Sequence, residues 1–275
     1  MTAEVCIMNR LAVVLAADSA ATVSQWTGSK YEERYFKGSN KIFQLSDHQP
    51  VGLMIFDSAD KRPDKNLNTS GLVFAGFGDH EIFPALAEFK SCGLICGKHV
   101  SISAEEFSIT HEVPAKLASF AQTAMSDTFS LGLSEDVYGS VMATLSEALE
   151  NFARTVISDS GGDVTKIANF GQVVANARKE MGGAILERAR IDHALPFRRV
   201  LGVLPVDEMA ELAETLIHLQ ALKEKVTKSS ETVGGPVDVA IITKSEGLVW
   251  VKRKHFFDIG LNSRYLVRQH NRLTG

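Results

Sequence analysis

The sequence predicts an α+β fold formed by a single domain, residues 2–275, in which strands from both ends of the chain surround a helical middle. Three observations predict it. Strand-like apolar runs fill the first ninety residues, helical periodicity replaces them after Pro114, and a last pair of apolar runs follows Gly234-Gly235-Pro236. Because strands from both termini of a layered domain meet in the same sheets, the expected order is sheet, helices, sheet.

Three hairpins are expected in the N-terminal part. The first is rich in Val, Ile, Leu and Ala with a polar break at Asn9-Arg10, which predicts two short buried strands and a tight turn. The polar stretch 57–70 contains Pro63 and is expected to be a loop. The expected strands are at 4–17, at 41–45 with 51–56, and at 72–77 with 83–89.

Helical spacing of apolar residues follows in the middle of the chain. It predicts helices over 115–131, 135–158 and 164–190, and the part at about 134–192 is expected to be a helical insertion in the domain. The clearest helix begins after Pro205 and ends near Thr227, with Asp207 and Glu208 suited to the positive end of its dipole. A final hairpin is expected at 237–243 and 248–254.

The composition excludes several classes of function. The chain has 275 residues, of which 45% are hydrophobic and 23% charged, with a net charge of -4 and no basic stripe. We therefore expect no nucleic-acid partner and, because no long apolar run is present, no membrane partner. Three cysteines, Cys6, Cys92 and Cys96, make a disulfide framework improbable and predict a cytoplasmic protein; their spacing predicts no metal site.

Thr2 is the first candidate for chemistry. It follows Met1 directly, and because Thr is small, an aminopeptidase is expected to remove Met1 and leave the hydroxyl beside a free α-amino group. Such a group has a pKa of about 7.7–8.0, so it can take the hydroxyl proton during attack on an acyl carbon. A Thr at position 2 is common, however, and alone it indicates little.

Asp18 and Lys41 are expected to lie beside Thr2. Asp18 comes sixteen residues later, where the first hairpin returns to residue 2, and Lys41 opens the next apolar strand. A buried Lys41 paired with Asp18 would lower the pKa of the Thr2 hydroxyl and support the amino base. The alternative is a surface ion pair, which is the commoner case for two such residues.

These residues carry a resemblance to a known family. Thr-Ala-Glu-Val-Cys-Ile at 2–7, Ala-Ala-Asp-Ser at 16–19 and Lys-Ile-Phe-Gln-Leu at 41–45 resemble the N-terminal Thr, acidic turn and Lys-Leu-Phe strand of proteasome β subunits and the bacterial HslV peptidase. The segments around Phe74-Ala-Gly-Phe-Gly, and the closing hairpin from Val237, are similar to later strand pairs of the same family.

The resemblance implies a four-layer αββα sandwich of the N-terminal nucleophile (Ntn) hydrolase type. It implies a threonine peptidase that cleaves polypeptide with Thr2 as nucleophile, Lys41 and Asp18 in support, and neither metal nor organic cofactor. It also implies a homo-oligomeric ring, with an ATP-dependent unfoldase as a partner that the sequence does not identify.

The sequence departs from the family at three places. The strand that ends in a small residue in the family ends here in Asp57, whose backbone NH is the expected oxyanion donor and whose carboxylate would oppose the developing charge. The helix pair expected next is replaced by 58–71, so one helical layer is reduced, and either the helices at 134–192 or a neighbouring subunit must cover that sheet face. The family's distal support group of Asp and Ser has no clean match here, and Glu231 is the best acidic candidate for it.

These departures keep a second function open. A catalytically inactive member that retains the fold as a scaffold or assembly protein is the alternative to a threonine-type amidohydrolase. A third alternative is a shortened relative that folds poorly alone.

Overall fold

The computed structural model describes residues 2–29, 31–46, 49–57, 70–95, 98–227 and 232–274. The chain divides into two compact units, the first formed by Met1–Gln122 with Leu204–Gly275 and the second by Thr123–Val203. Antiparallel sheets and helices make up the described residues, which confirms the α+β class. The helical stretch predicted at about 134–192 lies within the second unit.

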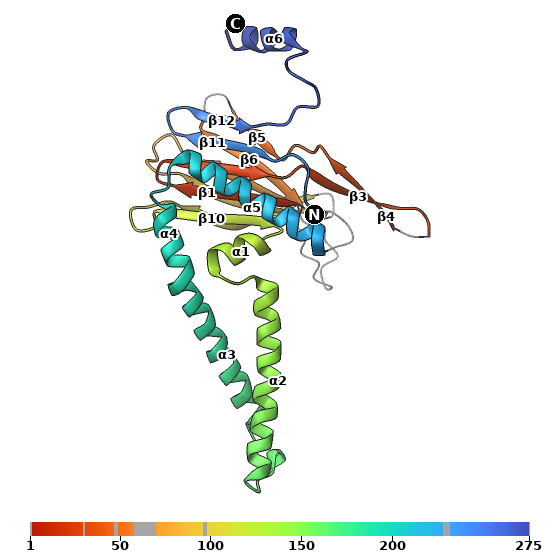
Figure 1. Cartoon of the computed structure of the whole chain (residues 1–275), viewed down its shortest axis with the longest axis vertical. Coiled ribbons are helices and arrows are strands. Elements are labelled where there is room, and N and C mark those ends of the chain that lie inside the picture. Colours follow the sequence, from red (N-terminus) through yellow and green to blue (C-terminus); the bar gives the residue numbers. More distant parts are fainter. Residues whose placement is uncertain are drawn as a thin grey trace. The chain divides into compact units, whose positions relative to one another are not determined.

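A five-stranded antiparallel sheet contains strands from both segments of the first unit (Figure 1). Its strand order is β10-β1-β2-β11-β12, so strands from the N-terminus and from the C-terminal third pair directly, as predicted. All residues of β1 and β2 are buried. The strands are β1 (Ala3–Asn9), β2 (Ala12–Ala17), β10 (Ala115–Ala121), β11 (Asp238–Thr243) and β12 (Gly247–Lys252).

A second five-stranded antiparallel sheet, in the order β5-β6-β7-β8-β9, packs against the first. Its inner face meets that of the first sheet in one apolar core, to which Cys6, Met8 and Leu15 contribute from one side and Met54 and Phe56 from the other. A separate ribbon pairs β3 (Ala20–Trp26) with β4 (Tyr31–Lys37). The strands of the second sheet are β5 (Ile42–Gln44), β6 (Val51–Asp57), β7 (Ser70–Gly76), β8 (Ala85–Ile95) and β9 (Lys98–Ser108).

Helix α5 (Val206–Thr227) packs on β1, β2 and β11 and covers the outer face of the first sheet. It buries Met209, Ala213 and Leu216. The apolar spacing continues to Leu222 and Val226, but these two side chains are exposed. Because one face of the first sheet meets α5 and the other meets the second sheet, its central strands consist almost entirely of apolar residues. The expected hairpins at 4–17, 41–56, 72–89 and 237–254 are confirmed.

The helix predicted over 115–131 is wrong in its first half. Residues 115–121 form β10, which pairs with β1, and α1 (Ala124–Leu131) begins only after it. The alternation of buried and exposed residues that indicates a strand is weak here, because Ala115, Ala118 and Phe120 are buried while the residues between them are only partly exposed. Local propensity does not distinguish helix from strand in this segment, and pairing along the whole length of β1 selects the strand.

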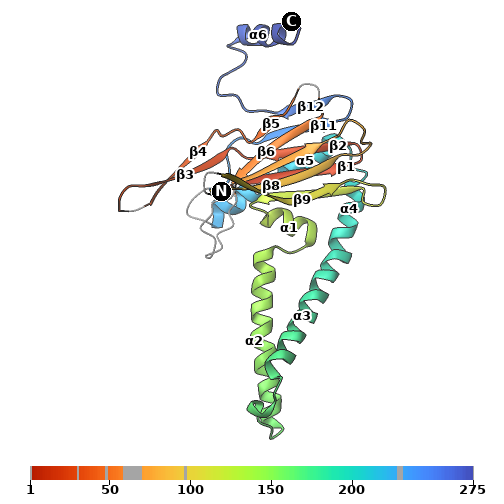
Figure 2. The ribbon, with the colours of Figure 1, turned by 180° about the vertical axis from the view of Figure 1, so that it is seen from behind.

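The second unit is helical and is described by itself. Its long helices α2 and α3 contact each other (Figure 2) and lie where the 135–158 and 164–190 spacing predicted helices. Its elements are α1, α2 (Glu135–Asp159), η1 (Val164–Lys166), α3 (Phe170–Ala189), η2 (Arg190–Ala194) and α4 (Leu195–Leu201).

A further helix, α6 (Ser263–Thr274), follows β12 near the end of the sequence. Among the described residues, no helix has both the length and the hydropathy needed to cross a membrane.

Candidate active site

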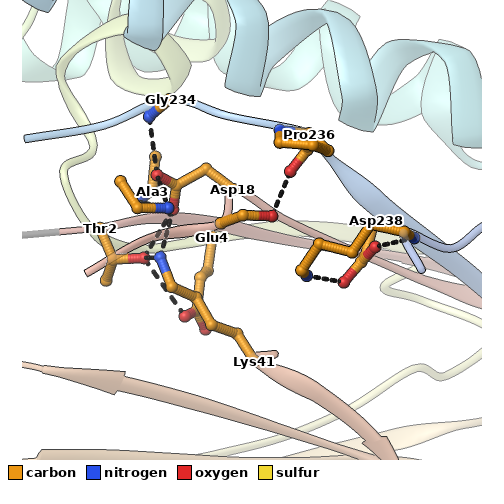
Figure 3. A network of polar contacts seen from close by, with 11 residues as sticks. Thr2, Ala3, Glu4, Asp18, Lys41, Gly234, Pro236 and Asp238 are labelled. Carbon is orange, nitrogen blue, oxygen red and sulfur yellow. Dashed lines mark hydrogen bonds and ion pairs between the residues drawn. The ribbon is translucent and has the colours of Figure 1, made fainter. Parts of the chain in front are cut away.

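Thr2, Asp18 and Lys41 come together at one end of the two-sheet core (Figure 3). Thr2 immediately precedes β1 and Asp18 immediately follows β2, and the antiparallel register that pairs Glu4 with Ala17 makes these two positions neighbours. Lys41 precedes β5 of the opposite sheet. The predicted hairpin thus brings the Thr2 hydroxyl and the Asp18 carboxylate together. The packing of the two sheets brings the Lys41 amine within hydrogen-bonding distance of both.

The three side chains form one closed network. The Thr2 hydroxyl donates to Asp18 Oδ1 at 2.7 Å, and the Lys41 amine donates to the same oxygen at 2.5 Å and also to Thr2 Oγ1. Thr2, Asp18 and Lys41 retain only 3%, 0% and 6% of their accessible surface. The alternative of a surface ion pair is therefore wrong, and the Asp18–Lys41 pair interacts in a medium that screens it little.

Backbone amides hold the Asp18 carboxylate in place. Oδ1 accepts from Ala3 N at 3.1 Å, and Oδ2 accepts from Ala20 N at 3.2 Å and from Gly234 N at 2.8 Å. Gly234 lies between α5 and β11, and its carbonyl accepts from Ser19 N at 3.1 Å. Asp18 is thus fixed by three separate segments, as a carboxylate that orients other groups must be.

Glu4 is a fourth polar residue of the site, and the sequence analysis did not assign it a role. Its side chain is fully buried, Oε1 lies 3.5 Å from Thr2 Oγ1, and Oε2 has no hydrogen-bond partner. Burial raises the pKa of this carboxyl well above its usual value, and Lys41 opposes that increase only in part. The sequence contains a signal for Glu4, because it is a charged residue within a run of apolar strand residues. Residues two apart on a strand share a face, so Glu4 is expected on the same face as Thr2.

A cavity of about 280 Å³ lies in front of Thr2. The Lys41 amine is held in the network described above, so the rest of the cavity presents uncharged groups to an incoming molecule. The cavity is lined by Thr2, Ala20, Ala21, Thr22, Ser39, Asn40, Lys41, Ile55, Phe56 and Ser70.

The other predicted site residues are outside this network or outside the described residues. Asp57 is the last residue of β6 and pairs with Ser70, which lines the cavity, so its backbone lies at the cavity's edge. Glu231 lies outside the described residues. Where residues are described, no group of three or more His, Cys, Asp or Glu side chains is placed to hold a metal ion.

No model of a known protein family and no curated protein matches this chain. Its chemistry is therefore inferred from the site itself. A hydroxyl that receives a hydrogen bond from an amine and gives one to a fixed carboxylate is arranged as an activated nucleophile.

Proposed function

We propose that this chain is a threonine-type peptidase or amidohydrolase of the proteasome class, with Thr2 as its nucleophile. The observation that carries the proposal is the position of the Thr2 hydroxyl, which lies between Lys41 and Asp18 and beside the cavity of about 280 Å³. The proposal requires cleavage of the bond between Met1 and Thr2, because the free α-amino group then serves as the general base.

Each residue has one role in the proposed reaction. Thr2 Oγ1 attacks the carbonyl carbon of the substrate, and its proton moves to the Thr2 α-nitrogen. The hydrogen bond from Lys41 stabilises negative charge that develops on Oγ1, while Asp18 keeps the Lys41 amine directed at that oxygen. The α-nitrogen then passes the proton to the leaving amine, and water hydrolyses the ester formed on Thr2.

The oxyanion of this reaction requires a donor at the other side of the carbonyl. We assign that donor to the backbone NH of Asp57, at the end of β6 beside Ser70. A negatively charged residue at this position is expected to oppose the developing negative charge of the oxyanion. Replacement Asp57→Gly is therefore expected to increase kcat, and a decrease would contradict the assignment.

We extend the proposal to the fold and the assembly. Two antiparallel sheets packed face to face, with α5 on the outer face of one, support an αββα sandwich of the Ntn-hydrolase type with one helical layer reduced. On the outer face of the other sheet, Phe43 retains 38% of its accessible surface. Exposed apolar side chains on a sheet face support contact with a second copy, as in a homo-oligomeric ring.

Labelling of the nucleophile tests the function directly. A peptide epoxyketone is expected to modify Thr2 in protein whose intact mass shows that Met1 is absent. We expect Thr2→Ala to abolish hydrolysis of fluorogenic peptides and Thr2→Ser to retain part of it. Thr144→Ala is the matched control, because the Thr144 hydroxyl is exposed on α2 and donates to Ser140 O of the same helix. Retention of Met1 in active protein would contradict the proposal.

One observation favours the inactive scaffold as a second function. The Thr2 side chain retains only 3% of its accessible surface, as a structural polar group at the edge of a core does. A scaffold is expected to form a stable oligomer in light scattering and to hydrolyse no peptide in any variant. Turnover that Thr2→Ala abolishes would reject this function.

A further inference from the structure

The Glu4 carboxyl lies between the Thr2 site and the apolar core. It is two residues after Thr2 on β1, and its neighbours across the sheet are Ala17 on β2 and Phe120 on β10, both core residues. Oε1 is 3.5 Å from Thr2 Oγ1, whereas Oε2 has no partner. A fully buried carboxyl with an unsatisfied oxygen is costly and requires a physical explanation.

The charges around Glu4 determine its state in the described structure. The charged groups that face it are Asp18 at the end of β2 and Lys41 before β5, and these two already form an ion pair. Phe120 supplies only an aromatic ring from β10. If Glu4 were ionised, the buried site would carry one uncompensated negative charge, so burial raises the pKa of the carboxyl and favours its neutral form.

Removal of Met1 would change this balance. It converts the Thr2 nitrogen from an amide into an amine, which is three covalent bonds from Oγ1, the atom that lies 3.5 Å from Glu4 Oε1. An amine with a pKa of about 7.7–8.0 is protonated over much of the neutral range. A positive charge within about 4–6 Å favours the ionised form of a carboxyl.

We propose that Glu4 is the proton partner of the Thr2 α-amino group, neutral while Met1 is attached and ionised once Met1 has been removed. The proton leaves a Glu4 carboxyl oxygen and binds the α-nitrogen, so the step is an internal transfer without any co-reactant. Its reversal returns the proton to Glu4 and restores the free amine that takes the Thr2 hydroxyl proton during attack. Glu4 is a positioning residue, because it acts on the α-amino group and is not one of the residues that line the cavity. The inference rests on the proposed function in taking Thr2 as the N-terminal residue.

Infrared difference spectroscopy tests the transfer without requiring turnover. Spectra of Glu4→Gln are subtracted from those of the unsubstituted chain at pH 7, in two forms of each protein. One form has lost Met1, and the other carries a short extension ahead of Met1 that keeps the Thr2 nitrogen an amide. We expect a protonated-carboxyl band for Glu4 in the extended form and a carboxylate band in the processed form.

The same band in both forms would overturn the inference. Glu4→Met fills a similar space without ionisable atoms and serves as the reference if Glu4→Gln does not fold. Circular dichroism and urea unfolding of each variant establish that the compared proteins are folded.

The pH dependence of kcat/KM gives a second readout. Loss of the Glu4 charge is expected to lower the pKa of the α-amino base, so the acid limb in processed Glu4→Gln shifts to lower pH by about one unit or more. A structural role alone would reduce kcat/KM equally at every pH and would contradict the inference. If no variant hydrolyses peptides, the proposed function fails, and the infrared spectra still decide the role of Glu4.

Discussion

Asp18→Asn perturbs the centre of the Thr2 network while it changes the side-chain volume little. The carboxylate accepts hydrogen bonds from Thr2 Oγ1, the Lys41 amine and the backbone NH groups of Ala3, Ala20 and Gly234. An amide has one oxygen and one NH₂ group, so at least two of these donors lose their acceptor. Each buried donor left without a partner costs about 1–3 kcal/mol.

Removal of the Asp18 charge lowers the free energy of unfolding further. Breaking a buried ion pair by removing one partner typically costs about 3–5 kcal/mol, because the other charge stays buried without compensation. Since Glu4 can ionise beside Lys41 and replace the lost charge, the measurement is made in a Glu4→Gln background. We expect Asp18→Asn to lower the free energy of unfolding by about 3–5 kcal/mol in that background and by less when Glu4 is present.

Urea unfolding followed by tryptophan fluorescence is the assay. Both tryptophans, Trp26 in β3 and Trp250 in β12, belong to the first unit, so their signal reports the part of the chain that contains the site. Lys41→Met together with Asp18→Asn removes both charges and is expected to cost less than the sum of the two single changes. A loss below about 1 kcal/mol for Asp18→Asn in the Glu4→Gln background would refute the reasoning.

Three further predictions concern the core around the site. In the form extended ahead of Met1, burial raises the Glu4 pKa above its ordinary value of 4.5, so the folded state binds more protons than the unfolded state above that pH. Stability therefore falls as pH rises from there, and urea titrations of that form at several pH values should show Glu4→Gln flattening this slope. Gly71→Ala places a Cβ 2.1 Å from the Phe56 ring and should lower the free energy of unfolding in urea by about 1–3 kcal/mol. The control Gly139→Ala adds a Cβ in open space on α2 and should raise that free energy by about 0.5–1 kcal/mol. Burial raises the pKa of the Cys6 thiol, so peptide mapping after alkylation should find Cys6 unmodified in folded protein and modified in urea. Alkylation of Cys6 at the same rate in folded and in urea-unfolded protein would contradict its burial.

Much of the sheet could be predicted because its signals are local. The turn at Asn9-Arg10 separates two apolar runs, and the resulting hairpin requires Asp18 to lie beside Thr2. Lys41 was predicted at the site because it opens the next apolar strand, although no local rule relates it to Thr2. Its contact with Asp18 depends on how the two sheets pack.

Long-range features of the site were not predictable from the sequence. The NH of Gly234 binds Asp18 across 216 residues, and a Gly-Gly-Pro turn gives no sign of such a contact. The strand at 115–121 was mistaken for helix because Ala is compatible with both structures, and only pairing with β1 selects the strand. Glu4 was overlooked because the cost of a buried carboxyl becomes apparent only when both sheet faces are known to be covered.

The backbone around Thr2 explains how its side chain can stay fixed while its nitrogen changes chemical state. Thr2 O accepts from Gln122 N at 3.0 Å, Ala3 N donates to Asp18 Oδ1 at 3.1 Å, and Ala3 O accepts from Asp18 N at 3.2 Å. These bonds all lie on the carboxyl side of Thr2. Ala121, which pairs with Ala3, has a φ of 64°, a left-handed conformation that costs a non-glycine residue about 1–2 kcal/mol. Such strain persists where surrounding contacts fix the backbone. Because these contacts do not involve the Thr2 nitrogen, we expect Thr2 Oγ1 to stay between Lys41 and Asp18 when that nitrogen changes from an amide to an amine.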